Sequence, residues 1–429
     1  MNRLIPQQAT PSSDHFSPNN PATGQITGKM GRRSLLRGAA AAGIAGLGGG
    51  AGLTRAAAGE SANGEAHSLV RTPPVYMGPK PDGFDLVWGV TRHARGWAEV
   101  RLPNSGEPVR FDHDGDGYVP QSRRYLHVPV HHLPARARGE FRVITESMEG
   151  ESERIESDWR PFRLPDASAT SARFAVWNDT HERDATLAKL DEITPRDIDG
   201  LIWNGDITND WHQDDWFASI LLNPGNTDFT NQRPLCFIHG NHDVRGKYAF
   251  LLPRHTPMPG GRTFFAARFG PVACLFLNTG EDKDDDHPSF RGRVAFDKLR
   301  REQAEWMADI TRSDLYRDAP YRVMFCHLPM RWTDERTDRD FDRFSWRSRQ
   351  YWHDHLVSWR TQVVISGHTH QPSWLPAADD FPYAQLIGGG PQMERATLIT
   401  GDADGEALRL KMVNMEGETL REVEFPPLA

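Results

Sequence analysis

Five short apolar runs, each stopping at polar residues, organise the chain between residues 172 and 391. An apolar run of this length that breaks off into polar residues is typical of a buried strand in a doubly wound fold, where sites lie at the carboxyl edge of the sheet. We therefore expect the residues after the runs to lie close together. The runs are 174–178 before Asp179-Thr180-His181, 201–204 before Gly205-Asp206, 235–238 before His239-Gly240-Asn241-His242-Asp243, 323–326 before His327, and 363–366 before Gly367-His368-Thr369-His370.

The segments between these runs show helical spacing of apolar residues, which predicts strand, polar motif and helix in alternation. A hairpin turning at Gly270-Pro271 and several strands after residue 380 add antiparallel pairs. The pattern as a whole predicts an α/β fold, a mixed two-sheet α/β sandwich. The predicted helices are 184–193, 211–222, 296–310 and 348–360, and the added strands are 263–269, 272–277, 383–387, 396–400, 407–413 and 420–425.

Residues 67–165 show a different pattern, with alternating strands at 85–90, 97–102, 124–130 and 139–144. Turns rich in proline and glycine separate the strands, and a helical period is missing, so we predict a small all-β sandwich. Within it, residues 112–117 resemble the start of a calcium loop, but the twelfth position is Arg123 where a glutamate is required, which favours a hairpin turn. Residues 165–172 read as a linker to a catalytic domain at 172–429.

The amino terminus has the features of an export signal. Arg32-Arg33 precedes an uncharged Ala/Gly-rich run at 38–54 that is too short and too weakly apolar for a stable membrane span. The order of these features resembles a twin-arginine signal, which implies the twin-arginine export machinery as a partner and a periplasmic, surface or extracellular location. A basic disordered tail is the alternative. We assign residues 1–58 to the leader, whose start is Met1 or Met30.

Composition and charge exclude some classes of function. The 429 residues carry a formal net charge of −8 and a pI of about 6.1, which argues against a nonspecific nucleic-acid binder but not against a small phosphorylated substrate. The three cysteines, Cys236, Cys274 and Cys326, lie inside apolar runs, so we expect buried thiols rather than a disulfide framework.

The five polar blocks, taken in order, resemble the calcineurin-like metallophosphoesterase superfamily over residues 172 to about 391. The β region is similar, in pattern and position, to the fibronectin-like domain that precedes the catalytic domain of purple acid phosphatases. The resemblance implies two metal ions (Mn, Fe or Zn) about 3.5–4 Å apart, which clamp a phosphoryl group and activate water as a bridging hydroxide nucleophile. It assigns Asp179, His181, Asp206 and His370 to the first metal, and Asp206 as a bridge with Asn241, His327 and His368 to the second.

The same resemblance leaves His242 free of metal, as the acid that protonates the leaving oxygen, with Asp243 orienting it. Two departures disfavour the purple subclass. That subclass has glycine where His181 stands, and a metal-binding tyrosine where this chain has Asn209. We therefore favour a phosphodiesterase over a phosphomonoesterase, and keep a noncatalytic metal-braced binding protein as the alternative of another class.

Two insertions are expected to shape access to the site. Residues 280–293 carry an acidic run, 281–286, for which we expect a solvated face. Residues 331–349 follow His327 directly and mix charge with aromatic side chains, which is typical of a lid or specificity loop.

Overall fold

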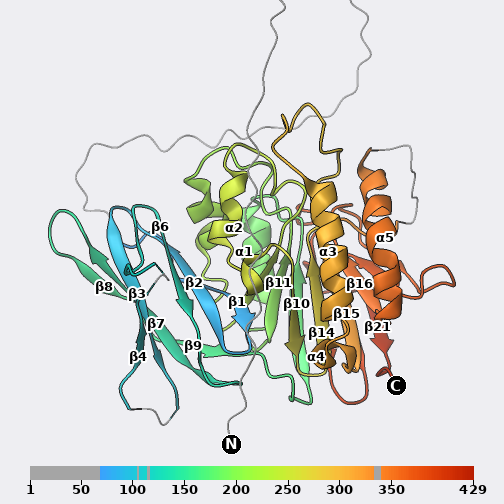
Figure 1. Ribbon diagram of the computed structural model, residues 1–429, viewed down its shortest axis with the longest axis horizontal. Coiled ribbons are helices and arrows are strands. Elements are labelled where there is room, and N and C mark those ends of the chain that lie inside the picture. The colour runs from blue at the N-terminus through green and yellow to red at the C-terminus, as the bar shows by residue number, and fades with distance from the viewer. Residues whose placement is uncertain (1–67, 104–105, 114–115, 333–339) are drawn as a thin grey trace, which may run out of the picture. The chain divides into compact units, whose positions relative to one another are not determined.

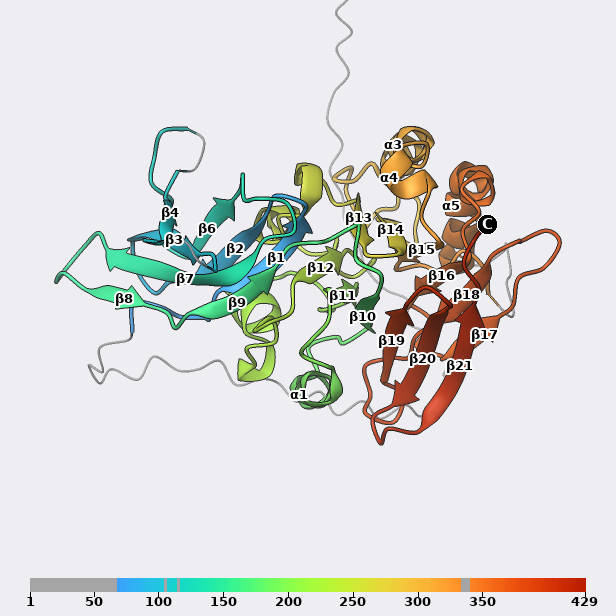
Figure 2. The ribbon, with the colours of Figure 1, turned by 90° about the horizontal axis from the view of Figure 1, so that it is seen from below.

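Two mixed sheets face each other across the main core, as Figure 2 shows, in a computed structural model that describes residues 68–103, 106–113, 116–332 and 340–429. The predicted export signal lies outside these residues. Among the described residues, no helix combines the length and the apolar character that crossing a membrane requires. The nine-stranded sheet has the order β21 (Thr419–Phe425), β20 (Leu408–Asn414), β19 (Thr397–Ala403), β10 (Ala172–Trp177), β11 (Gly200–Asn204), β12 (Leu235–Ile238), β1 (Val75–Lys80), β2 (Gly83–Gly89), β6 (Tyr125–Val130).

The second sheet holds the other two motif strands, β15 and β16, and the predicted hairpin of β13 and β14, which pairs Phe269 with Val272. Parallel pairing joins β14 to β15 and β15 to β16, so that the ends of β15 and β16 meet at one edge. The predicted mixed α/β architecture is confirmed. The sheet has the order β13 (Phe265–Phe269), β14 (Val272–Leu277), β15 (Tyr321–Cys326), β16 (Val363–Ser366), β18 (Ala384–Ile387), β17 (Ser373–Leu375).

Helices cover the outer faces of the two sheets (Figures 1 and 2). The helix α1 (Asp184–Ile193) packs on the first sheet through Leu187 and Leu190. On the second sheet, α3 (Phe296–Ile310) and α5 (Asp340–Ser358) contribute Met307 and Trp352 to a separate apolar cluster. The bounds of α1 and α3 agree with the prediction, and α5 begins eight residues earlier than predicted. Two short helices, α2 (Leu252–His255) and α4 (Asp314–Arg317), lie in the connections.

The predicted helix at 211–222 is wrong over its first half. Only Phe217–Leu222 is helical, as a π-helix. Trp211 instead pairs with a different loop, because its N–H donates to the carbonyl of Arg245 (3.0 Å) and its carbonyl accepts from the N–H of Tyr248 (3.0 Å). These bonds tie the segment after Asp206 to the segment after His242.

Residues 75–163 form strands, but one of their sheets is shared with the motif strands. The parallel pair of β1 and β12 joins Met77 to Leu235, which makes β1, β2 and β6 part of the nine-stranded sheet. A third sheet, comprising β3 (Ala94–Arg101), β4 (Val109–Phe111), β5 (Gln121–Ser122), β7 (Arg138–Ser147), β8 (Arg154–Glu156) and β9 (Arg160–Arg163), completes this region. Three strands of the region predicted to form a separate sandwich therefore belong to the large sheet. Residues 114–115 of the predicted turn lie outside the described residues.

Side chains along β1 and β2 point alternately to two different cores, which explains why these strands belong both to the β region and to the large sheet. Val75 and Met77 face the main core, whereas Tyr76 faces a second core with Trp88 and Phe141. A strand buried on both faces needs apolar residues at consecutive positions. Two packed cores therefore share these strands.

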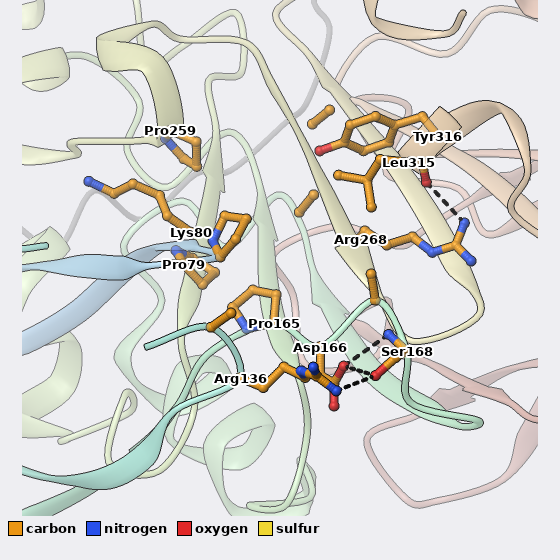
Figure 3. Close-up of a pocket in the computed structure, with 15 residues that line it drawn as sticks. Pro79, Lys80, Arg136, Pro165, Asp166, Ser168, Pro259, Arg268, Leu315 and Tyr316 are labelled. Carbon is orange, nitrogen blue, oxygen red and sulfur yellow. Dashed lines mark hydrogen bonds between the residues drawn. The ribbon is translucent and has the colours of Figure 1, made fainter. Parts of the chain in front are cut away.

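The predicted linker is packed rather than free. Pro165 and Asp166 line a cavity of about 300 Å³ together with Lys80 of β1 and Arg268 of β13, as Figure 3 shows. The Asp166 carboxylate accepts hydrogen bonds from the N–H (2.9 Å) and hydroxyl (2.6 Å) of Ser168. These contacts fix the entry into β10.

Candidate metal centre

The predicted ligands converge at one edge, where β10, β11 and β12 of the first sheet meet β15 and β16 of the second. Their donor atoms form two groups, and within each group all donors lie within 4.8 Å of one another. The carboxylate of Asp206 joins the groups, because its Oδ2 lies 3.5 Å from Nε2 of His181 and 3.1 Å from Nε2 of His327. The first group is Asp179, His181 and His370; the second is Asp206, His327 and His368.

Contacts around the two groups hold the ligand atoms in place. Nε2 of His370 lies 3.3 Å from Oδ1 of Asp179 and 3.2 Å from Nε2 of His181. The carboxylate of Asp179 also accepts the backbone N–H of His368 at 2.9 and 3.0 Å. Oδ1 of Asn241 lies 2.8 Å from Nδ1 of His368, beside the second group where the prediction placed it. All the predicted ligands are thus brought together.

The protonation pattern of His327 fits a metal ligand. Its Nδ1 donates to the carbonyl of Asn204 (2.9 Å), which leaves the lone pair on Nε2. That Nε2 is buried, and although Oδ2 of Asp206 lies 3.1 Å away, no described residue makes a hydrogen bond of good geometry with it. An unmade buried hydrogen bond costs about 1–3 kcal/mol. A cation between this nitrogen and Asp206 would remove that cost, so the residues present fit a divalent metal.

The electrostatics of the site also favour a bound cation. Burial opposes a charge on His327, but the nearby carboxylates of Asp206 and Asp179 outweigh it and raise the pKa of His327 to about 10. Burial would likewise raise the pKa of Asp206, yet the adjacent His327 holds that pKa well below its usual range. A divalent ion would satisfy the carboxylates without requiring an imidazolium.

Backbone strain is concentrated in the same residues. Five proposed ligands have a positive φ, a region that residues other than glycine rarely adopt and that recurs at functional sites. The glycine before His368 is also required, because a Cβ on Gly367 would come within 2.2 Å of Oδ2 of Asp179. The positive φ angles are 52° at Asp179, 41° at His181, 53° at Asp206, 71° at His368 and 55° at His370.

His242 lies at the margin of the centre. Its ring centroid is 5.1 Å from that of His181, and its Nδ1 is 2.7 Å from the carbonyl oxygen of Asn209. Since a carbonyl only accepts, Nδ1 carries a proton, and Nε2 is the ring nitrogen that can accept from Arg245 or face a substrate. The guanidinium of Arg245 contacts the ring as well, with Nη1 3.2 Å from Nε2 and 3.3 Å from Nδ1.

The predicted role of Asp243 needs correction. Its carboxylate does not orient His242 but accepts three backbone N–H groups, from Asp206 (2.7 Å), Gly240 (2.8 Å) and Ile207 (3.1 Å). Burial, together with the charge of Asp206, raises the pKa of Asp243 to about 7. Asp243 therefore clamps the loop after β12 to the loop after β11, and positions the ligands rather than the acid.

The acidic run was predicted to be a solvated face, and for its first two residues this is wrong. Glu281 is 0% exposed and pairs with Arg245, and Asp282 accepts from the same guanidinium at 2.9 Å. The sequence carried no signal for this cluster, because its members lie 36 and 37 residues apart. Arg245 is thus a residue of the site that sequence reasoning missed.

The second insertion also reaches the centre. The ring centroid of Trp332 lies 5.7 Å from that of His368. Arg347 of α5 pairs with Asp284 at 2.9 Å, which joins the two insertions. The expectation that these segments border the site agrees with these contacts.

The three cysteines are buried and unbridged, as predicted. Cys326 donates its thiol to the carbonyl of Leu328 (3.1 Å), and burial raises the pKa of that thiol. This protonated thiol is a poor metal ligand.

Comparisons with known proteins agree with this geometry. Residues 172–372 match the calcineurin-like phosphoesterase family. The chain is 23% identical over 286 residues to purple acid phosphatase 21 of Arabidopsis thaliana; the match covers 62% of this chain and 57% of that relative. The chain thus spans little more than half the length of this curated relative.

Two solved structures share the fold. Purple acid phosphatase PPD1 from seeds of yellow lupin (Lupinus luteus) superimposes with a TM-score of 0.60 at 10% identity, over 82% of this chain and 74% of the other. A structure of PhoD superimposes with a TM-score of 0.56 at 11% identity, over 85% of this chain and 90% of the other. The family match therefore places a calcineurin-like phosphoesterase domain at residues 172–372, and the two solved structures agree with it in fold.

Proposed function

We propose that the protein is an exported, metal-dependent hydrolase of phosphate esters. The observation that carries this proposal is the convergence of two ligand groups on the shared carboxylate of Asp206, with His242 beside them. Two ions bound there would polarise the phosphoryl oxygens and lower the pKa of coordinated water. We further infer that His181, Asn241 and the other predicted ligands hold these ions.

The chain's own contribution to the reaction is to supply a proton at a fixed place. Because Nδ1 of His242 is held by the carbonyl of Asn209, only Nε2 can face a leaving oxygen. In the imidazolium form that nitrogen donates a proton as the ester bond breaks. Arg245 restricts the ring from the other side, and Asp243 fixes the loops that carry Asp206 and Asn241.

Within this class we favour a phosphodiester substrate. The support is the histidine at position 181 and the asparagine at position 209, where the purple subclass has glycine and a ligand tyrosine. The side chain of Asn209 is exposed, while its backbone groups serve His242 and Glu182. A phosphomonoester is the second candidate, since purple acid phosphatase PPD1 shares the fold and purple acid phosphatase 21 is similar in sequence. Export by the twin-arginine route and a fibronectin-like origin of residues 67–165 are further parts of this proposal.

The test is hydrolysis by protein reconstituted with Mn, Zn or Fe, measured with p-nitrophenyl phosphate and bis(p-nitrophenyl) phosphate. We expect turnover that a chelator abolishes, with the diester cleaved faster. Asp206→Asn should lose metal and activity together, whereas Asp402→Asn, on the exposed part of β19, should retain both. Retained metal without turnover of either ester, with every ion, would instead support a noncatalytic binding protein.

A further inference from the structure

A second cavity borders the loop that carries His242. It encloses about 440 Å³, within the range of small-molecule sites, roughly 300–1,000 Å³. One wall follows the loop after β12 and the other follows the start of α3. Val244 lines it, next to Arg245, whose guanidinium instead contacts His242. The apolar lining includes Val244, Phe250, Pro253, Phe290, Phe296 and Leu299.

A buried polar side chain that makes no hydrogen bond with the described residues lines this cavity. His239 is 4% exposed, and its ring receives no hydrogen bond from the described part of the chain. A neutral imidazole ring offers one N–H donor and one acceptor nitrogen. The cavity therefore presents a polar contact deep inside an apolar wall.

Two cations line the same cavity. Lys247 is exposed and lies over the ring of Tyr248, and Arg293 donates to the backbone carbonyl of Phe290 (2.9 Å). Neither forms an ion pair with a described carboxylate, although the chain as a whole carries a net charge of −8. Phe250, 69% exposed, lies on the same cavity. An apolar cavity with two uncompensated cations is complementary to an amphiphilic anion.

We propose that this cavity binds a small amphiphilic anion. Its aromatic or acyl body packs against Phe290 and Phe296, its carboxylate, sulfonate or phosphate lies near Lys247 and Arg293, and a polar atom of its body bonds to His239. The site is separate from the metal-binding groups, and the proposal stands whether or not the chain hydrolyses phosphate esters.

The test uses 8-anilinonaphthalene-1-sulfonate with the folded, metal-loaded full chain, and follows probe fluorescence. We expect saturable binding of one probe per chain. The double variant Lys247→Glu with Arg293→Glu should weaken binding about tenfold or more, which corresponds to about 1.4 kcal/mol. N-phenyl-1-naphthylamine has the same rings without the sulfonate, so its weaker binding should not respond to the charge reversal.

Controls locate the probe within the molecule. Lys298→Glu makes one such charge reversal on α3 outside the cavity, at a side chain that is 78% exposed, and should leave binding unchanged. His239→Leu, checked for folding by its melting curve, should weaken both probes. Binding that Asp206→Asn abolishes and the double variant retains would place the probe at the metal centre and overturn the proposal. So would equal affinity in the wild type and the double variant, or the absence of saturable binding.

Discussion

His242 contacts Asn209 and Arg245 through its ring, and its backbone N–H donates to Oδ1 of Asp206 (2.8 Å). A residue so tied to the loops can have a purely architectural role or a chemical one. The two roles separate experimentally, because the ring itself is not among the predicted metal ligands. The ring can therefore be removed while the backbone contact to Asp206 is kept.

We predict that His242→Ala lowers kcat by about 10²–10⁴ while metal content and melting temperature stay near those of the wild type. His212→Ala provides the matched control, since His212 lies on the neighbouring loop with an exposed side chain. Steady-state kinetics and elemental analysis check both variants. Loss of metal along with activity would show that His242 supports the centre rather than the proton transfer.

At the scale of residues, the sequence predicted the metal ligands better than the residues that position them. Asp179, Asp206 and His327 follow apolar runs directly, so their shared edge could be predicted from strand periodicity. Asp243 and Arg245 also follow such a run, but their partners are set by how distant loops meet. Glu281 lies in a charged stretch, and its burial requires the ion pair with Arg245. The spacing of residues along the chain does not predict that pair.

At the scale of elements, the first insertion stabilises the start of α3. Asp285 accepts the N–H groups of Phe296 (3.0 Å) and Asp297 (3.0 Å), two of the donors that a helix leaves unpaired at its first turn. The acidic run thus also supplies a capping carboxylate from outside the helix. Its negative charge is favourable at that end of the helix dipole.

We predict that Asp285→Ala lowers the free energy of unfolding by about 0.5–2 kcal/mol, because both N–H groups lose their acceptor. Asp286→Ala is the matched control at the next position, which is exposed. Chemical denaturation monitored by circular dichroism measures the two changes. An equal effect of both substitutions would show that Asp285 acts only as part of the general charge.

Helix prediction succeeded where the helix packs on a sheet. The apolar stripe of α3 covers the second sheet, and its bounds could be read from the sequence. The segment around Trp211 carries similar residues, but its backbone groups bond to Arg245 and Tyr248 instead of to each other. Hydrogen bonds to a distant loop thus replace the hydrogen bonds of a helix. The spacing of apolar residues within the segment does not predict this replacement.

At the scale of the whole described chain, His255 lies where the β region meets the catalytic layers. Its ring centroid is 4.5 Å from those of both Tyr125 in β6 and Phe217 in the π-helix. Burial lowers the pKa of His255 to about 4, with further lowering from Arg254 and His127. In the unfolded chain the group returns to its ordinary pKa of about 6.5.

We predict acid-sensitive stability from this group. Between pH 6.5 and 4, His255 is protonated in the unfolded state but not in the folded state. The stability that this group contributes above pH 6.5 is therefore lost as the pH falls. The loss is at most roughly 3 kcal/mol. His255→Phe should flatten the dependence of melting temperature on pH in this window, whereas His131→Gln, at an exposed position, should not. Parallel curves for all three proteins would exclude this contribution.

The last prediction concerns cooperativity. β1 pairs with β12 on one side and β2 on the other, and its side chains alternate between the two cores. Unfolding the β region alone would therefore expose apolar side chains of the catalytic core and leave the edge of β12 unpaired. We predict a single calorimetric transition over the described chain, rather than the separate melting expected of an independent sandwich joined by a linker.

Met77→Asp tests this coupling at the site where β1 pairs with β12. Burial of an unpaired charge there should lower the free energy of unfolding by about 3–5 kcal/mol and shift the single transition as a whole. Val109→Asp, at an exposed position of β4, should leave it nearly unchanged. If calorimetry instead resolved two transitions and Met77→Asp shifted only the lower one, the shared sheet would not couple the regions energetically. A single displaced transition would mean that the metal-binding edge draws part of its rigidity from strands that contribute no ligand.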